Sequence, residues 1–221
     1  TLAAIEKGRD IAFANKETLV VGGALVEDAA SRNGVKLLPV DSEHSAVFQC
    51  LQAKGDSGRI GKLILTASGG PFFGKSREEL ASVRPEEALR HPTWTMGRKV
   101  TIDSATMANK GLEIMEAAHL FGVTQDKIEV IIHRESMVHS MVEFIDHSVL
   151  AQLGVPDMRT PIQYALTWPE RLPSTVKQIN LTEIGALTFY RPDDAAFPSM
   201  RIARRALSLG GTAGAAFNAA D

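Results

Sequence analysis

The stretch that decides the fold class runs Asp10-Ile11-Ala12-Phe13-Ala14, then a helical pattern from Glu17 to Asn33, then Val35-Lys36-Leu37-Leu38-Pro39-Val40. The two apolar runs have the length of short buried strands, and the segment between them has the period of a helix. Strand, helix and strand in this order are typical of parallel βαβ packing. We therefore expect an α/β protein that begins within a parallel sheet.

Beyond this unit the pattern changes. An apolar strand from Lys62 to Thr66 ends at the glycine-proline loop Ala67-Ser68-Gly69-Gly70-Pro71. Three more apolar segments follow one another closely later in the chain, and such spacing is typical of antiparallel strands. These segments are Ile128 to His133, Met137 to Ile145 and Val149 to Leu153.

Four parts are predicted along the chain. Residues 1–41 complete the parallel sheet, and residues 42–167 form a second unit with helices and a mixed or antiparallel sheet. Residues 168–193 are punctuated by prolines and are predicted to be a linker. Residues 194–221 begin a helical domain.

The composition is that of a globular protein, with 221 residues, 44% hydrophobic and 23% charged. A formal net charge of -2 gives no long-range field to attract nucleic acid or an anionic membrane, and no apolar run approaches the roughly 20 residues that span a bilayer. A phosphate ligand would therefore be held by local groups. The single cysteine, Cys50, excludes an internal disulfide and fits a reducing compartment.

Carboxylates follow the second strand directly. Asp41 and Glu43 project to one side if the chain stays extended, at the place where α/β sheets bind ligands. Glu113 adds a third carboxylate from a predicted helix, and three oxygen ligands suit Mg²⁺ or Mn²⁺. The alternative is that the two acids form a solvated helix N-terminus.

Donors for a phosphate gather around the segment Asp103 to Glu113. Ser104 and Thr106 can cap a helix that ends at Phe121, and a helix start with nearby hydroxyl, amide and ammonium groups can hold a phosphate. The alternative is an ordinary helix cap beside an exposed lysine. The candidate donors are Ser68, Ser104, Asn109 and Lys110.

Two further segments carry candidate ligands. In Asn15-Lys16-Glu17, where a strand turns into a helix, Lys16 can bind substrate oxygens or a phosphate. The alternative is a plain helix start. The loop from His91 to Gly97 presents Trp94 and Met96 between a proline and a glycine, as a mobile flap or as ordinary packing. Three other histidines are not in metal-ligand spacing, and structural roles are predicted for them. They are His44, His133 and His139.

Taken together, six motifs occur in the order found in the 1-deoxy-D-xylulose 5-phosphate reductoisomerase family, which this chain resembles over essentially its whole length. They are Ala14 to Glu17, Pro39 to His44, Thr66 to Pro71, His91 to Gly97, Asp103 to Glu113 and Pro156 to Arg159. The resemblance implies that residues 1–41 are the end of a Rossmann-like NADPH-binding domain. It also implies that residues 42–167 are a catalytic domain, followed by the linker and a truncated C-terminal helical domain.

The resemblance implies a role for each candidate residue. The metal ligands would be Asp41, Glu43 and Glu113, and the phosphate site would be Ser68, Ser104, Asn109 and Lys110. The residues around the reacting sugar oxygens would be Lys16, Ser42, Glu43 and His91, with Lys16 and Glu43 as the catalytic pair and Glu113 also in contact with the substrate. Contacts to NADPH would come from Asn15, Glu17 and Gly97, and the flap would consist of Trp94 and Met96.

The implied activity is a metal-dependent skeletal rearrangement followed by NADPH reduction to 2-C-methyl-D-erythritol 4-phosphate, in isoprenoid biosynthesis. The full-length protein is expected to be a homodimer in the bacterial cytoplasm, with the plastid as an alternative. Two other hypotheses remain open from the residues: a sugar-phosphate aldolase or isomerase without reduction, and a non-enzymatic sugar-phosphate binding module.

Two departures from the family pattern stand out. The family commonly has His-Pro-Gln-Ser where this chain has His133-Arg134-Glu135-Ser136, which puts the local strand and turn geometry in doubt. The glycine-rich phosphate loop of the NADPH domain is absent, and the chain has no initiating Met. We therefore expect a fragment that binds NADPH poorly and is inactive on its own.

Overall fold

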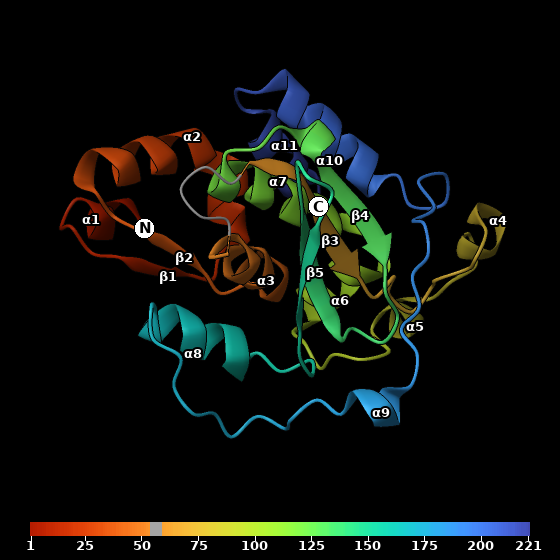
Figure 1. The fold of residues 1–221 in the computed structure, drawn as a ribbon. Helices are drawn as coiled ribbons and strands as arrows, with labels where there is room; N and C mark the ends of the chain where they lie inside the picture. Colours follow the sequence, from red (N-terminus) through yellow and green to blue (C-terminus); the bar gives the residue numbers. More distant parts are fainter. Residues whose placement is uncertain (54–58) are drawn as a thin grey trace.

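The computed structural model describes residues 1–53 and 59–221. Strands β1 (Ile11–Phe13) and β2 (Leu37–Pro39) pair in parallel, with Ile11 opposite Leu37, and α2 (Lys16–Asn33) connects them. Asn15 accepts the N–H of Thr18 at the start of α2, and Gly34 ends the helix in a left-handed conformation. The predicted βαβ unit is therefore present, with a short helix α1 (Leu2–Ile5) before it (Figure 1).

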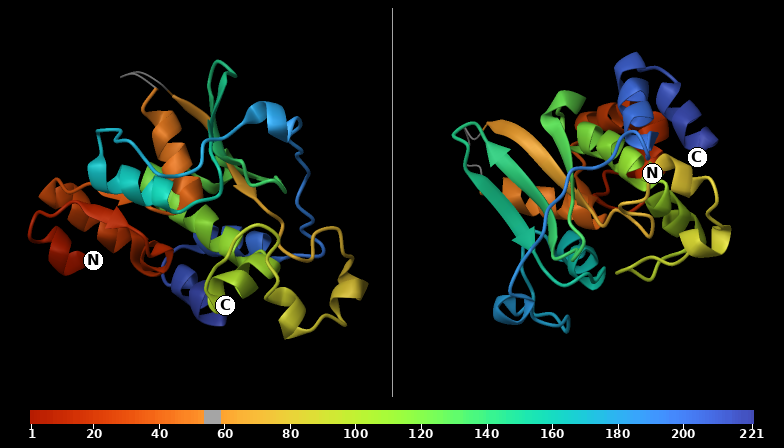
Figure 2. Two further views of the ribbon diagram at one scale, coloured as in Figure 1. Left: turned by 90° about the horizontal axis from the view of Figure 1, so that it is seen from below. Right: turned by 90° about the vertical axis from the view of Figure 1, so that its right-hand side faces the viewer.

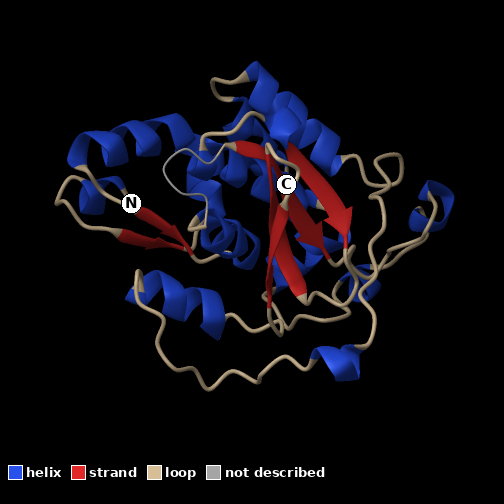
Figure 3. Ribbon diagram, viewed as in Figure 1, coloured by secondary structure: helices blue, strands red, loops and turns tan. Residues whose placement is uncertain are grey.

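The second sheet is mixed and lies on the other side of the molecule in Figure 3. Its strand order is β4-β3-β5-β6, with β3 and β4 parallel and the pairs β3–β5 and β5–β6 antiparallel. The last three strands were expected to be antiparallel, which β5 and β6 confirm. For β4 the expectation was wrong, because it lies beside β3 and runs parallel to it. The strands are β3 (Ile60–Ala67), β4 (Ile128–Ile132), β5 (Val138–Phe144) and β6 (Val149–Leu153).

Helix α7 (Ala108–Phe121) lies at the centre of the fold. Nine of its fourteen residues are buried, because it packs against the mixed sheet, α2 and α10 (Ser199–Leu209). Both views of Figure 2 place α10 and α11 (Ala213–Ala220) beside it. Any polar side chain on the buried faces of α7 must therefore find its partners inside the protein.

One predicted helix is two helices in the structure. The chain breaks between α6 (Arg98–Ala105) and α7 at Met107, which has φ 60°. Thr106 accepts the N–H of Ala108 at 3.3 Å, as a cap does, whereas Ser104 lies inside α6 and caps nothing. The prediction for Ser104 as a cap was wrong, because two short helices replace one long one.

The remaining elements are short. Residues 168–193 are mostly exposed and reach the mixed sheet at a single antiparallel bridge between Tyr190 and Ile132. Among the described residues, no helix combines the length and apolar character needed to cross a membrane. The other helices are α3 (Ser42–Leu51), α4 (Arg77–Leu80), α5 (Pro85–Ala88), the 3₁₀ helix η1 (Gln125–Lys127), α8 (Arg159–Thr167) and α9 (Leu181–Ile184).

Candidate active site

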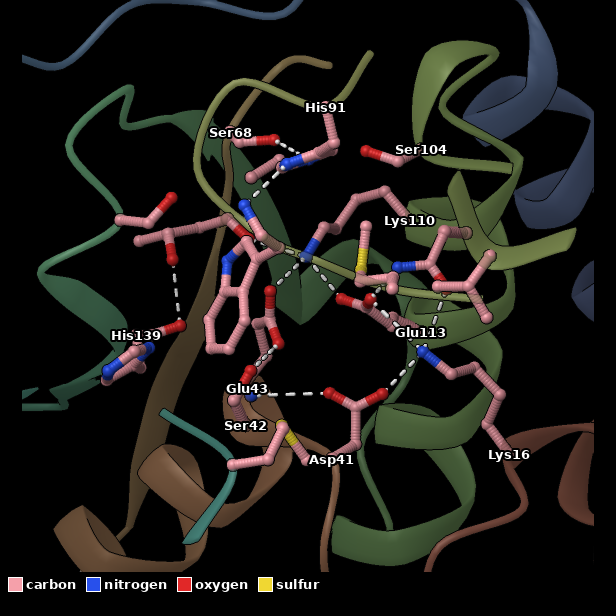
Figure 4. A pocket seen from close by; sticks show the side chains of 18 of the residues that line it. Lys16, Asp41, Ser42, Glu43, Ser68, His91, Ser104, Lys110, Glu113 and His139 are labelled. Atoms are coloured by element: carbon pink, nitrogen blue, oxygen red, sulfur yellow. Dashed lines mark hydrogen bonds and ion pairs between the residues drawn. The ribbon is translucent and has the colours of Figure 1, made fainter. Parts of the chain in front are cut away.

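A cavity of about 370 Å³ opens between the two sheets and brings together segments that are far apart in the sequence (Figure 4). Its walls come from the start of α2, the start of α3, the loop after β3, the 91–97 loop and helices α6 and α7. Twelve of the predicted residues line it: Lys16, Asp41, Ser42, Glu43, Ser68, His91, Trp94, Met96, Ser104, Asn109, Lys110 and Glu113.

Three carboxylates meet on one side of the cavity. After Val40 the chain does not stay extended, as assumed for the acid pair, but enters α3 with Asp41 as its cap, accepting the N–H of Glu43 at 3.3 Å. Asp41, Glu43 and Glu113 each place a carboxylate oxygen within 4.8 Å of the others. The acids do start a helix, but their side chains are only 10% and 20% exposed, and this all-oxygen set fits Mg²⁺ or Mn²⁺.

Lys16 points into this group of carboxylates from the first turn of α2. Its ammonium group contacts Asp41, donates to Asn109 Oδ1 at 2.9 Å and lies 3.2 Å from Glu113 Oε1. Burial alone would lower the pKa of Lys16, but the charges of Asp41 and Glu113 raise it well above the ordinary value. Burial would likewise raise the pKa of Asp41, and the Lys16 ammonium instead holds it well below its usual range.

Lys110 lies on the other side of the same carboxylates. Its Nζ donates to Glu43 Oε1 at 3.0 Å and to the Thr66 carbonyl at 2.5 Å, and it also contacts Glu113. Burial, and then the Glu113 carboxylate, raise the pKa of Glu43 to about 7, against the opposing charge of Lys110. Lys110, which was predicted to bind a phosphate, thus offsets the negative charges of Glu43 and Glu113 in this structure.

A layer of buried groups behind the carboxylates was only partly expected. His44 has Nε2 at 2.9 Å from the Glu113 carbonyl, and its Nδ1 lies 3.4 Å from Asp41 and 3.3 Å from Glu116. Glu116, which the sequence analysis missed, is fully buried. Burial would lower the pKa of His44, but Glu116 and Asp41 raise it to about 9. His44 thus connects two of the candidate metal-ligand positions.

Ser68 is held in a defined hydrogen-bonding state by His91. The ring Nδ1 of His91 accepts the N–H groups of Thr93 at 3.2 Å and Trp94 at 2.9 Å, so Nε2 carries the proton and donates to Ser68 Oγ at 2.9 Å. Ser68 Oγ also accepts the N–H of Gly70 at 3.2 Å. With both acceptor positions used, the hydroxyl proton of Ser68 is free to be donated to an anion.

The loop after β3 also packs against α6. Gly70 has φ 65°, and a Cβ there would lie 2.7 Å from the Ser104 carbonyl oxygen. This close approach brings Ser68 and Ser104 to the same end of the cavity. Asn109 is committed differently, since its amide donates to Glu113 and accepts from Lys16.

The 91–97 loop forms the rim of the cavity. The Trp94 ring lies 6.3 Å from that of His139, centroid to centroid, and Met96 also faces the space. His139, predicted to be structural, is nearly buried and also lines the cavity, together with Ser136. Burial lowers the pKa of His139. Strand spacing alone could not have placed these residues there.

The three residues implied for NADPH lie just outside the cavity. The Asn15 amide donates to Glu17 Oε2 at 3.0 Å at the exposed start of α2. Gly97 is exposed and is the N-cap residue of α6. Their neighbours Ala14, Lys16 and Met96 line the cavity, so these residues border its mouth.

Models of one protein family match three parts of the chain. They are described as 1-deoxy-D-xylulose 5-phosphate reductoisomerase for residues 1–23, as its C-terminal domain for residues 37–121, and as the DXP reductoisomerase C-terminal domain for residues 153–221. The matches include the strands and helices that carry the carboxylates, both lysines and the serine loop.

Curated relatives match along the entire chain. The 1-deoxy-D-xylulose 5-phosphate reductoisomerase of Symbiobacterium thermophilum is 61% identical over 221 residues, and that of Heliobacterium modesticaldum is 59% identical. Each match covers 100% of this chain and 56% of the relative. The chain thus spans little more than half the length of these relatives.

Solved structures give the same result. The reductoisomerase of Zymomonas mobilis in complex with NADPH superimposes with a TM-score of 0.92 at 47% identity, covering 100% of this chain and 56% of that one. A DOX-P reductoisomerase in complex with NADPH, fosmidomycin and magnesium gives 0.93 at 48% identity, covering 99% and 56%. With the family models, the sequences of the relatives and the solved structures all in agreement, the chain belongs to the 1-deoxy-D-xylulose 5-phosphate reductoisomerase family.

Proposed function

We propose that this chain provides the metal- and substrate-binding part of an enzyme that converts 1-deoxy-D-xylulose 5-phosphate to 2-C-methyl-D-erythritol 4-phosphate with NADPH, a step of isoprenoid biosynthesis. The observation that carries the proposal is the single cavity in which three carboxylates, two lysines and the Ser68 loop converge. Relatives along the entire chain, and similar structures solved with NADPH, fosmidomycin and magnesium, support it.

The donor set fits a hard divalent cation. Asp41, Glu43 and Glu113 would hold Mg²⁺ or Mn²⁺, and the metal would stabilise negative charge on two neighbouring substrate oxygens while the carbon skeleton rearranges. His44, bonded to the backbone of Glu113 and lying beside Asp41, supports these ligands from behind. The metal-binding role of the three carboxylates is part of the proposal.

Lys16 and Glu43 are the residues placed to handle protons. The Lys16 ammonium, held by Asp41, Asn109 and Glu113, lies beside the space where the sugar oxygens would bind and can donate to them. Glu43, whose neighbour Ser42 donates to it at 2.5 Å, can accept a proton from a sugar hydroxyl. The proposed rearrangement passes through retro-aldol and aldol steps that need both transfers.

The phosphate end would bind away from the reacting carbons. The free hydroxyl proton of Ser68 and the hydroxyl of Ser104 are proposed to hold it. Lys110 and Asn109 are proposed to join them once the metal ion replaces their side chains as the partner of Glu43 and Glu113. Binding energy from this remote group can close the 91–97 loop, with Trp94 and Met96 excluding water from the fragments.

The reduction requires NADPH at the mouth of the cavity. Asn15, Glu17 and Gly97 are proposed to contact it, and NADPH would supply the hydride to the aldehyde. Because the chain spans 56% of its relatives' length, the remaining contacts belong to the rest of the enzyme. We also propose a homodimer and a bacterial cytoplasmic location.

The test uses the protein encoded by the complete gene. With 1-deoxy-D-xylulose 5-phosphate and Mn²⁺, absorbance at the NADPH band should fall, and EDTA should stop the reaction. Glu113→Gln should lower turnover by roughly 10²-fold or more, as expected when a group that acts in the transition state is lost. Absence of NADPH consumption would contradict the proposal, and a rearranged but unreduced product would favour the aldolase or isomerase.

A further inference from the structure

Arg134 makes a contact that links two segments of the cavity wall. It follows β4, and its Nη1 donates to the carbonyl oxygens of Ser68 at 2.5 Å and Gly70 at 2.8 Å. The guanidinium carbon lies 5.0 Å from the centre of the Phe73 ring. Arg134 therefore binds both ends of the short loop that carries the Ser68 hydroxyl.

The backbone of residues 68–70 needs contacts from outside the loop to keep one conformation. Gly69 and Gly70 are both left-handed, with φ 78° and 65°, and glycine has the largest backbone freedom of any residue. The Ser68 hydroxyl reaches its hydrogen-bonding state only if the N–H of Gly70 and the ring of His91 both stay in place. Fixing the two carbonyl oxygens restricts the peptide plane that precedes Gly69 and the one that follows Gly70.

We propose that Arg134 is a positioning residue that holds the Ser68 hydroxyl toward the phosphate end of the substrate. The inference rests on the proposed function. It gives a role to the departure noted in the sequence, because a proline at this position would have no side-chain donor for the two carbonyl groups.

The shape of the contact requires arginine rather than any cation. A planar guanidinium can donate to two carbonyl oxygens and lie over an aromatic ring at the same time, whereas a lysine ammonium is a compact point charge. Arg134→Lys should therefore keep the charge but lose the geometry. Arg134→Gln should lose both.

The same contact influences His91. Burial, and then the positive charge of Arg134, lower the pKa of His91. Arg134 in turn faces Glu135 and Tyr190, and Glu135 Oε1 accepts the Thr188 hydroxyl at 2.7 Å. Removing the Arg134 charge should therefore raise the pKa of His91, which imidazole NMR can follow independently of turnover.

The experiment compares the complete gene product with Arg134→Gln, Arg134→Lys, Ser68→Ala and the Arg134→Gln, Ser68→Ala double variant. Arg134→Gln should raise KM for the sugar phosphate about tenfold, as for loss of hydrogen bonds to a charged donor, and should leave kcat within about twofold. Arg134→Lys should recover only part of the loss. In the Ser68→Ala background, Arg134→Gln should add little, because coupled residues are not additive.

Arg32→Gln is the matched control, since Arg32 is an exposed arginine that pairs with Asp28 on the surface. It should change neither KM nor the pKa of His91. Thermal unfolding of each variant checks the fold, and Arg134→Lys serves if Arg134→Gln does not fold.

Two results would overturn the proposal: an unchanged KM in Arg134→Gln, or a loss that is equal with and without Ser68. If the wild-type protein shows no turnover, the proposed function fails instead. The NMR titration then still decides about Arg134, because an unchanged pKa of His91 in Arg134→Gln, where the charge is lost, would contradict the placement of Arg134 beside the Ser68–His91 pair.

Discussion

Charges of opposite sign are tightly interleaved in the candidate site. Lys110 is 4% exposed and faces Glu43 and Glu113, while Lys16 faces Asp41 and Glu113. Removing one member of a buried ion pair leaves the other charge without compensation, which costs far more than the pair itself contributes. Replacing one of these lysines should therefore change the free energy of unfolding as well as ligand binding.

Lys110→Met should destabilise the metal-free protein by up to about 3–5 kcal/mol, because Glu43 would lose its lysine partner and Glu113 would keep only Lys16. Urea unfolding in the presence of EDTA measures the loss. Added Mn²⁺ should restore part of it, since a cation bound to the folded state stabilises that state.

Lys62→Met is the matched control for Lys110→Met. Lys62 also lies between two carboxylates, at 2.6 Å from Glu129 and 3.3 Å from Glu143, but on the surface, where such pairs contribute about 0–1 kcal/mol. Equal destabilisation by the two substitutions would refute the interpretation of Lys110 as the buried counter-charge.

At this scale the sequence predicted which residues lie near one another better than it predicted their hydrogen bonds and ion pairs. All three carboxylates and both lysines line one cavity as expected, because motif order and residue type were informative. The link from His44 to Glu116 could not be predicted, since it joins α3 to α7 across the interior. The spacing of Glu113 and Glu116 on one helix face was the available signal.

At the scale of elements, α7 organises the fold because it is surrounded on most sides. Gly111 lets Phe217 and Ala203 approach, with a Cβ at that position only 3.0 Å from the Phe217 ring. Gly214 in α11 does the same against α2, where a Cβ would lie 2.2 Å from the Val20 carbonyl oxygen. Small residues at these crossings set how closely the helices pack.

Gly214→Ala should destabilise the protein by about 1–3 kcal/mol, the usual cost of overpacking, because the backbone of α2 must move away from the added methyl group. The urea midpoint at unchanged slope measures it. Gly22→Ala is the control, since a Cβ there meets nothing within 4 Å. A larger loss at Gly22 than at Gly214 would mean that the α2–α11 crossing is not tightly packed.

Whether a segment is a helix or a strand was largely predictable from the sequence. Which strands lie next to one another in the sheet was not. The βαβ start and the strands of the mixed sheet follow from apolar period and turn residues. The place of β3 between β4 and β5 depends on a crossover of sixty residues, from Ala67 to Ile128, which no local pattern encodes. The break between α6 and α7 depends on the left-handed Met107, an uncommon conformation for a non-glycine residue.

For the molecule as a whole, the end of the chain packs back onto its beginning. Residues 168–193 are mostly exposed and lead to α10 and α11. These two helices then cover α7 and α2 (Figure 2). The predicted boundaries at residues 41, 167 and 193 stay predictions. What the packing indicates is that residues 194–221 are held by contacts with the preceding parts.

Limited proteolysis tests this arrangement. Trypsin should cut first after Lys177, which is exposed and lies outside any helix or strand, because exposed irregular backbone fits a protease most easily. Arg204 should resist, since it lies in α10 and its guanidinium donates to the carbonyls of Gln125 and Ile128 at 2.6 Å each. Mass spectrometry of the early fragments identifies the site.

The nicked protein should stay assembled. Tyr190 exchanges two backbone hydrogen bonds with Ile132, at 2.8 and 2.9 Å, and buried Met200, Ala203 and Phe217 hold the later segment against the rest. Size-exclusion chromatography should therefore elute both fragments together, although denaturing gels separate them. Separate elution, or a first cut at Arg204, would mean that residues 194–221 form an independently mobile domain and that the contacts with α2 and α7 contribute little to its position.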